Sequence, residues 1–387
     1  MGNSQSPPAD PRFSSATRAF TQKDLEDLNS LFVSLAAQSK SNNAYISLSV
    51  FQSVYEKGTR DDIEEFIYQL LNVTGDGVVG RCDIESVLAA ILRSIFSLEA
   101  SNPRLNSHRE IINVFLNAAK FSKVVEGAAE ISMSFEDFRS WCALLPSIRK
   151  FLGSLLLPPN AGRLGSQVPH LVHGDNINPD LILLREEYAW HIGGALPHHE
   201  LVEWKLLYHS AINGMSFNTF LGSTSNGEGP TILIIKDKDG YIYGGYASQP
   251  WERHGDFYGD LKSFLFQLYP KASIFKPTGA NNNVQWCAAN FSSESIPNGI
   301  GFGGRVNHFG LFLSASFDVG QTFTCTTFGS PCLSKTNRIF PEVIECWGIV
   351  QNEAQQEKLD AAKGTVLERF KEDRHMLNMV GLANSSE

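Results

Sequence analysis

The stretch Gly229-Pro-Thr-Ile-Leu-Ile-Ile-Lys-Asp-Lys-Asp-Gly-Tyr-Ile-Tyr-Gly-Gly-Tyr-Ala-Ser-Gln-Pro-Trp251 decides the fold of the larger part of this chain. Residues 231–236 are rich in β-branched side chains, residues 237–240 form a turn sequence that ends on glycine, and residues 241–247 are a second run. Two such runs around a short glycine-containing turn are typical of a β-hairpin. The pattern therefore predicts a hairpin.

Both arms of this hairpin indicate a position inside a sheet. The first arm is apolar on both faces, which is typical of a strand that is covered on both sides. On the second arm, Gly244 and Gly245 predict the close approach of a bulky group, either the indole of Trp251 or a facing sheet.

Further short sequence motifs lie on both sides of the hairpin. Together with Gly229-Pro230-Thr231 and Pro250-Trp251, their order and spacing resemble the TLDc domain family over residues 184–348. The resemblance implies an antiparallel two-sheet β-sandwich with flanking helices. These motifs are Trp204-Lys-Leu-Leu-Tyr-His-Ser210, Ile296-Pro-Asn-Gly-Ile-Gly-Phe-Gly-Gly304, Phe309-Gly-Leu-Phe-Leu313, Cys325-Thr-Thr-Phe328 and Glu345-Cys-Trp-Gly348.

Length and composition predict a globular, cytosolic protein. The 387 residues, 42% of them hydrophobic, are enough for two or three domains with ordinary cores. A net charge of −9 without a basic stripe disfavours nucleic acid as a partner. The six scattered cysteines include no Cys-x-x-Cys pair, so we expect reduced thiols. No stretch approaches the ~18 consecutive apolar residues of a membrane helix.

We predict the fold class α+β, in which an all-α domain over residues 21–155 precedes the sandwich. Apolar periodicity predicts helices in this first domain. Residues 61–96 have the helix-loop-helix layout of an EF-hand, and residues 45–51 and 131–138 each resemble the short strand and entering helix of one. The expected domain is EF-hand-like and held by packing. The predicted helices are 61–71, 84–96, 107–119 and 135–145, followed by further helices at 181–190 and 201–210 in the sandwich part.

The first EF-hand-like loop has poor calcium ligands. With Gly77 at the sixth, turn-making position, only two candidate side chains are carboxylates, and an aspartate replaces the bidentate glutamate at position twelve. We predict a degenerate, structural loop and no cofactor; a working calcium site, and with it a calcium-responsive switch, is the alternative. The candidate ligands are Asn72, Thr74, Asp76, Val78 and Asp83.

Composition divides the rest of the chain. Residues 156–180 are rich in proline and glycine and are predicted to be a linker to the TLDc domain at 181–350. Residues 351–387 are predicted to form a C-terminal helical extension. Its apolar stripe either packs on its own domain or forms an arm that binds a groove on a partner. The candidate contact residues on this stripe are Leu359, Val366, Phe370 and Leu377.

Residues 1–20 are predicted to be a flexible tail that carries a lipid. Met1-Gly-Asn-Ser-Gln-Ser6 fits the N-myristoylation pattern with Gly2 as the acceptor, and the family includes a myristoylated branch. One myristoyl chain binds membranes only marginally, and the tail lacks a second signal. We expect reversible or partner-assisted attachment to the cytosolic face of lysosomal, vacuolar or other endomembranes.

The sequence contains no complete catalytic motif. His199-Glu200-Leu-Val-Glu203 begins like a zinc protease motif, but Glu203 replaces the second histidine. Gly301-Phe-Gly303-Gly304 lacks the third glycine of a dinucleotide loop and is interpreted as a tight loop. Most of the five histidines between residues 170 and 199 are interpreted as solvated or capping side chains, with a metal site as the alternative. Glu345 lies between apolar neighbours and needs either a partner or an open face.

The family resemblance implies a protein that engages the vacuolar proton ATPase and acts in oxidative-stress resistance and in nutrient signalling through the TOR kinase at lysosomes. With no catalytic residues predicted, we expect a non-enzymatic regulatory adaptor that contacts peripheral subunits of this ATPase. The alternatives are the calcium-responsive switch and an oxidative-stress-protective enzyme that uses Glu345.

Overall fold

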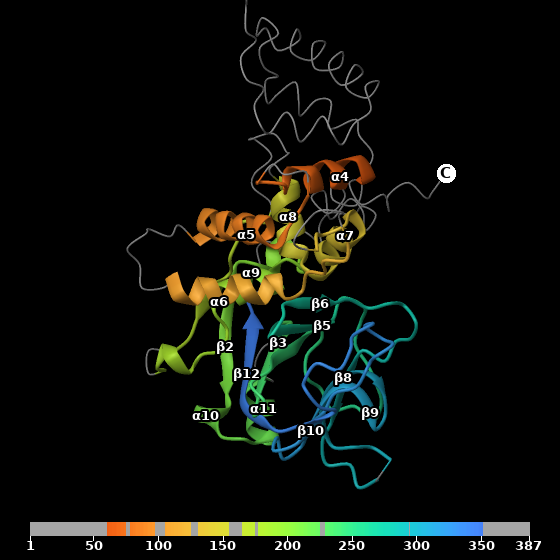
Figure 1. Cartoon of the computed structure of the whole chain (residues 1–387). Coiled ribbons are helices and arrows are strands. Elements are labelled where there is room, and N and C mark those ends of the chain that lie inside the picture. Colours follow the sequence, from red (N-terminus) through yellow and green to blue (C-terminus); the bar gives the residue numbers. More distant parts are fainter. Residues whose placement is uncertain are drawn as a thin grey trace, which may run out of the picture.

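The computed structural model describes residues 60–74, 78–96, 105–124, 131–154, 165–174, 177–224, 229–293 and 295–350. The predicted tail 1–20 with Gly2, the EF-hand-like stretch 45–51 and the predicted extension 351–387 lie outside the described residues. Figure 1 shows the helices α4 to α9 gathered at one end of the strands.

Helices make up the first part of the described chain. The four helices predicted between residues 61 and 145 are confirmed, with bounds that differ by a few residues. The helical elements are α4 (Arg60–Leu70), α5 (Arg81–Phe96), α6 (Leu105–Leu116), α7 (Phe135–Leu144), α8 (Pro146–Ser154), η2 (Pro179–Leu181), α9 (Glu186–Gly193), η3 (His198–Glu200), α10 (Ser210–Asn213) and α11 (Phe217–Thr224).

The strands form two sheets. One has seven strands in the order β1-β2-β12-β3-β4-β5-β6, and the other has five in the order β11-β10-β9-β8-β7. Neighbours pair antiparallel except β1 with β2. The strands are β1 (His170–Val172), β2 (Glu203–His209), β3 (Thr231–Asp237), β4 (Ile242–Ala247), β5 (Phe264–Tyr269), β6 (Ser273–Phe275), β7 (Gln285–Ala288), β8 (Gly299–Arg305), β9 (His308–Ser314), β10 (Gly320–Gln321), β11 (Arg338–Ile339) and β12 (Pro341–Ile349).

The predicted hairpin is confirmed as β3 and β4, in the middle of the larger sheet. Leu233 and Ile235 point into the core between the two sheets, whereas Ile232 and Ile234 point to the opposite face, where the helices lie. The facing sheet explains Gly245, because a Cβ there would lie 2.7 Å from the ring of Phe302 on β8. The sandwich therefore needs glycine at this position.

Two sequence interpretations are wrong in this region. Residues 201–210, predicted to be helical, form β2 and pair with β12. Trp204 and Tyr208 are four residues apart, which fits a helix face, but pairing with the neighbouring strand decides the outcome. The supposed tight loop around Gly303 lies inside β8, which pairs with β9 in one unbroken register on both sides of Gly303 although this glycine has a φ of 65°.

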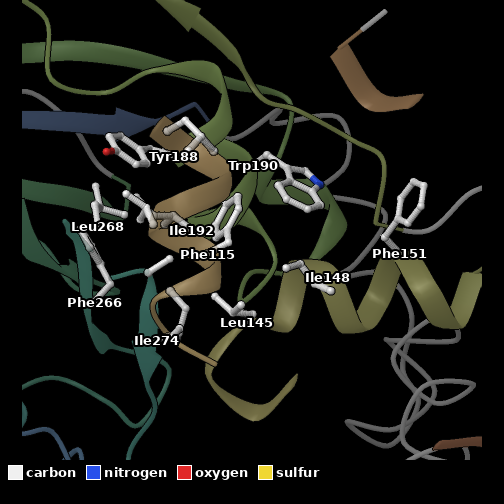
Figure 2. Close-up of a cluster of buried hydrophobic side chains, with 14 of the residues drawn as sticks. Phe115, Leu145, Ile148, Phe151, Tyr188, Trp190, Ile192, Phe266, Leu268 and Ile274 are labelled. Carbon is white, nitrogen blue, oxygen red and sulfur yellow. The ribbon is translucent and has the colours of Figure 1, made fainter. Parts of the chain in front are cut away.

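One continuous apolar core joins the helices to the outer face of the seven-stranded sheet. Figure 2 shows Phe115 of α6, Ile148 of α8 and Trp190 of α9 in one cluster with Phe266 of β5 and Ile274 of β6. The rings of Phe115 and Trp190 meet edge to face with centroids 6.0 Å apart. The helical layer and the sandwich therefore share buried surface.

Polar contacts cross the same boundary. The amide of Ala272 donates to the carbonyl of Val114 at 3.0 Å, and Lys150 Nζ donates to the carbonyl of Leu196 at 3.0 Å. The tightest point is between α8 and α9: a Cβ on Gly194 would overlap the backbone of Ser147. Because backbone cannot move as a side-chain end can, only glycine allows this spacing.

Replacing Gly194 with alanine should therefore weaken the junction. We expect Gly194→Ala to lower the free energy of unfolding by about 2–3 kcal/mol, because the added methyl group forces α8 and α9 apart. Gly153→Ala on α8 is the matched control: a Cβ there meets nothing within 4 Å, so we expect a gain of about 0.5 kcal/mol from helix propensity. Urea unfolding of both variants measures the difference, and equal stability would contradict the packing described.

Candidate functional site

The loop between α4 and α5 is held by a buried carboxylate. Asp83 is 2% exposed. Its Oδ1 accepts the amide of Thr74 at 2.8 Å and its Oδ2 accepts the amide of Gly80 at 2.8 Å. Of the other candidate ligands, Asn72 and Val78 lie in the same loop, and Asp76 lies outside the described residues. Both oxygens of the residue at position twelve thus bind backbone.

A second carboxylate, that of Asp137, holds the facing loop in the same way. Asp137 Oδ2 accepts the amides of Ser122 and Ser134, at 3.1 and 3.0 Å, and the hydroxyls of both serines. Val79 and Met133 form an isolated antiparallel bridge between the two loops. Each aspartate follows its bridge residue by four positions, so the two loops are built alike. Sequence reasoning missed Asp137, although Ser134-x-x-Asp137 is a capping-box pattern.

The electrostatics of Asp137 fit this structural role. Burial alone would raise the pKa of Asp137, but the hydrogen bonds from Ser122 and Ser134 outweigh burial and lower this pKa to about 2. The carboxylate is therefore ionised at neutral pH and accepts hydrogen bonds from four donors. A depressed carboxylate pKa stabilises the fold above about pH 4, and this contribution is lost as the pH falls toward 2.

Calcium should leave the stability of the chain unchanged, because a metal ion would have to displace the amides that Asp83 binds. A site of about 1 mM affinity would add about 1 kcal/mol at about 5 mM calcium. We expect no shift of the thermal midpoint between calcium and a chelator. Asp83→Asn should lower the free energy of unfolding by about 1–3 kcal/mol under both conditions. A calcium-dependent rise in the midpoint that Asp83→Asn abolishes would contradict this assignment.

Glu345 on β12 is the most deeply buried carboxylate of the sandwich, with 0% exposure. Its Oε1 accepts the amide of Leu183 at 2.5 Å, and its Oε2 accepts Trp347 Nε1 at 2.9 Å and the amide of Leu184 at 3.3 Å. Of the two possibilities that the sequence left open, the outward-facing position, which the strand context favoured, is wrong: Glu345 has partners, two of them from a segment about 160 residues away in sequence.

His209 completes this cluster. Its Nδ1 accepts the amide of Ala211 at 3.1 Å, so the proton is on Nε2. Nε2 lies 3.1 Å from the carbonyl of Leu181 and 3.6 Å from Glu345 Oε1. Burial raises the pKa of Glu345, while the hydrogen bonds from Leu183 and Trp347 and the nearby His209 oppose that rise. Every group in the cluster binds the chain itself, so the arrangement fastens the segment before α9 to β12.

Neutralising this carboxylate should destabilise the fold. In Glu345→Gln the new amide group faces backbone N–H donors, and we expect the free energy of unfolding to fall by about 2–4 kcal/mol. Glu342→Gln is the matched control on the same strand, because Glu342 is 49% exposed and its pair with Lys236 is a surface pair worth at most about 1 kcal/mol. A fully stable Glu345→Gln protein that loses a cellular effect would instead favour the catalytic alternative.

The other titratable candidates are scattered. Of the histidines expected to be mostly solvated or capping, His170 is 76% exposed, whereas His191 is fully buried and burial lowers its pKa to about 3. Within the described ranges, no three histidine, cysteine or acidic side chains are placed to hold a metal ion. All six cysteines are free thiols, and burial raises the pKa of Cys346 to about 12, which disfavours a reactive thiolate there.

The predicted lipid-carrying and partner-binding residues belong to the two ends of the chain. Gly2 and the stripe of Leu359, Val366, Phe370 and Leu377 lie outside the described residues. In the part of the chain that is described, none of the helices has both the length and the apolar character to cross a bilayer.

Comparison with known proteins identifies the sandwich. Residues 178–350 match the family described as the TLDc domain, so this part of the chain is a TLDc domain. The chain is 36% identical over 189 residues to the MTOR-associated protein MEAK7 of Danio rerio, an alignment that covers 48% of this chain and 41% of the relative. The predicted resemblance to the TOR-associated branch of TLDc proteins is confirmed.

Two further relatives extend the comparison. The MTOR-associated protein MEAK7 of Gallus gallus is 25% identical over 372 residues, which covers 87% of this chain and 76% of that protein. Oxidation resistance protein 1 of Xenopus tropicalis is 35% identical over 144 residues, 37% of this chain and 16% of the relative. In the zebrafish alignment the chain spans about two fifths of the relative's length.

Proposed function

We propose that this TLDc protein is a non-enzymatic regulatory adaptor in TOR-linked signalling, which binds peripheral subunits of the vacuolar proton ATPase on endomembranes. The observation that carries the proposal is the similarity to proteins named for their association with MTOR, which in the chicken relative reaches across 87% of this chain. The ATPase enters through the family resemblance, and the oxidation resistance relative agrees with a role in stress.

The shared core supports an adaptor. Because α6, α8 and α9 pack with β5 and β6 in one cluster, the helical layer and the TLDc domain can present their surfaces as one body. The strongest candidate for a catalytic carboxylate, Glu345, is fully buried and binds donors of its own chain. These two features favour a binding role over catalysis.

Attachment and contact would come from the two ends of the chain. A myristoyl group on Gly2 would hold the protein at the cytosolic face of a lysosomal or vacuolar membrane. The apolar stripe of residues 351–387 would then lie in a groove on the partner, in the manner of an amphipathic helix. In this proposal the EF-hand-like helical layer is a structural spacer that works without calcium.

A pull-down from solubilised endomembranes tests the adaptor. We expect the full chain to retain proton-ATPase subunits and TOR-complex proteins, identified by mass spectrometry. A Phe370→Ser, Leu377→Ser double variant should reduce this recovery at least about tenfold if the stripe carries more than about 1.4 kcal/mol of binding. Glu368→Gln, a polar change in the same segment, is the control and should bind as the original chain does.

One outcome would revise the contact site, and another would contradict the adaptor role. If the double variant recovered the ATPase subunits and TOR-complex proteins equally well, the contact would lie on the surface of residues 60–350 and not on the stripe. Absence of both the ATPase and the TOR complex, with a folded full-length chain that carries the lipid, would contradict the adaptor role.

A further inference from the structure

A polar pocket opens on the sandwich directly after the hairpin that defines the domain. It has a volume of about 290 Å³ and is formed by the loop that joins β4 to β5. Neither the Glu345 cluster nor the two aspartate loops touch it. The lining residues are Gln249, Pro250, Glu252, His254, Tyr258, Gly259 and Asp260.

One wall of the pocket is a pair of stacked flat rings. The rings of His254 and Tyr258 lie 4.2 Å apart at an angle of 21°. The Tyr258 hydroxyl donates to the carbonyl of Pro250 at 3.0 Å and accepts the amide of Glu252 at 3.2 Å, so the inner ring is fixed. The side chain of His254 is 44% exposed, which leaves it able to receive a planar group.

Two carboxylates give the pocket negative charge. Glu252 is 69% exposed and lies 4.0 Å from His254 Nε2. Asp260 is held in place, because Ser248 Oγ donates to it at 2.6 Å and the amide of Lys262 donates at 2.9 Å. Burial opposes ionisation of Asp260, but these hydrogen bonds lower its pKa.

The neighbouring cations only partly offset this charge. Lys262 lies close enough to Asp260 to lower the pKa of that carboxyl. The guanidinium of Arg253 packs over the ring of Phe291, 4.4 Å from its centroid, and donates to the carbonyl of Asn290 at 3.2 Å. Arg253 is thus engaged elsewhere, although it lies between the pocket residues Glu252 and His254 in sequence.

A fully buried side chain beneath the pocket has an unused acceptor. Gln285 Nε2 donates to Tyr258 Oη at 2.9 Å and to the carbonyl of Gln249 at 3.2 Å, which turns Oε1 to the other side. Gln285 Oε1 is buried and accepts no hydrogen bond within the described ranges. It points at the Gly259 wall, where a Cβ would lie 3.5 Å from it. Gln285 thus holds the Tyr258 hydroxyl and the Gln249 carbonyl of the pocket wall, and its own buried oxygen lies out of reach of a ligand.

We propose that this pocket binds the guanidinium group of an arginine side chain presented by a partner protein. A guanidinium is planar, stacks on rings and offers several N–H donors to carboxylates, which matches the His254 face between Glu252 and Asp260. The described part of the chain has no cluster of three metal-binding side chains, which favours an organic cation. The proposal rests on the sandwich alone and holds whichever partner the adaptor engages.

A peptide titration of the full chain tests the pocket. The probe is the tripeptide acetyl-Gly-Arg-Gly-amide, followed through the backbone amide signals of residues 252–260 by NMR. We expect saturable shifts with millimolar-scale affinity, weakened about five- to tenfold by Glu252→Gln and by His254→Ala, a change of about 1–1.4 kcal/mol. Glu342→Gln is the control, because it removes an exposed carboxylate of the same sandwich outside the pocket.

Matched peptides define what would overturn the assignment. The same tripeptide with citrulline keeps the shape of arginine without its charge and should not bind. Equal binding of the citrulline peptide, no saturable shift, or unchanged affinity in both pocket variants would refute the cation site. Equal binding of the lysine tripeptide would refute the guanidinium preference. Thermal unfolding of each variant confirms that the exposed substitutions leave the fold intact.

Discussion

The structure depends on one constraint: the central strands of the seven-stranded sheet are apolar on both faces. Ile232 and Ile234 of β3 point away from the sandwich core, as does Trp347 of β12. Leaving such a face in water would cost about 25 cal/mol for each Å² of apolar surface. The helical layer removes this cost because its own apolar side chains, such as Phe115 and Ile148, fill the same cluster. The two parts are therefore joined by the need to bury that face.

Buried polar groups then fix the backbone around this core. Asp83, Asp137 and Glu345 are each held by N–H groups of loops or of a segment remote in sequence. Such carboxylates satisfy backbone donors that would otherwise be buried without a partner. His191 is one exception, since neither ring nitrogen has a hydrogen-bond partner within the described ranges, and it remains neutral.

Local sequence was enough for some elements and not for others. The hairpin could be predicted because β-branched runs and a glycine turn act within a few residues. Strand β2 was mistaken for a helix, since Trp204 and Tyr208 fit both periods and the decision comes from β12. Strand β8 was mistaken for a loop, because its glycines are typical of turns and the strand is defined by its pairing with β9. The backbone partners of Glu345, at Leu183 and Leu184, lie about 160 residues away, so no local pattern could reveal them.

Native-state hydrogen exchange tests most directly whether the helical layer and the sandwich form one unit. Amides of α6 and α8 should exchange through the same opening reaction as those of β3 and β5, with equal opening free energies and equal sensitivity to denaturant, because they share one core. If the amides of α6 and α8 instead opened at a clearly lower free energy while β3 stayed protected, the helical layer would be a separately unfolding part. That result would contradict the shared core as the basis of the fold.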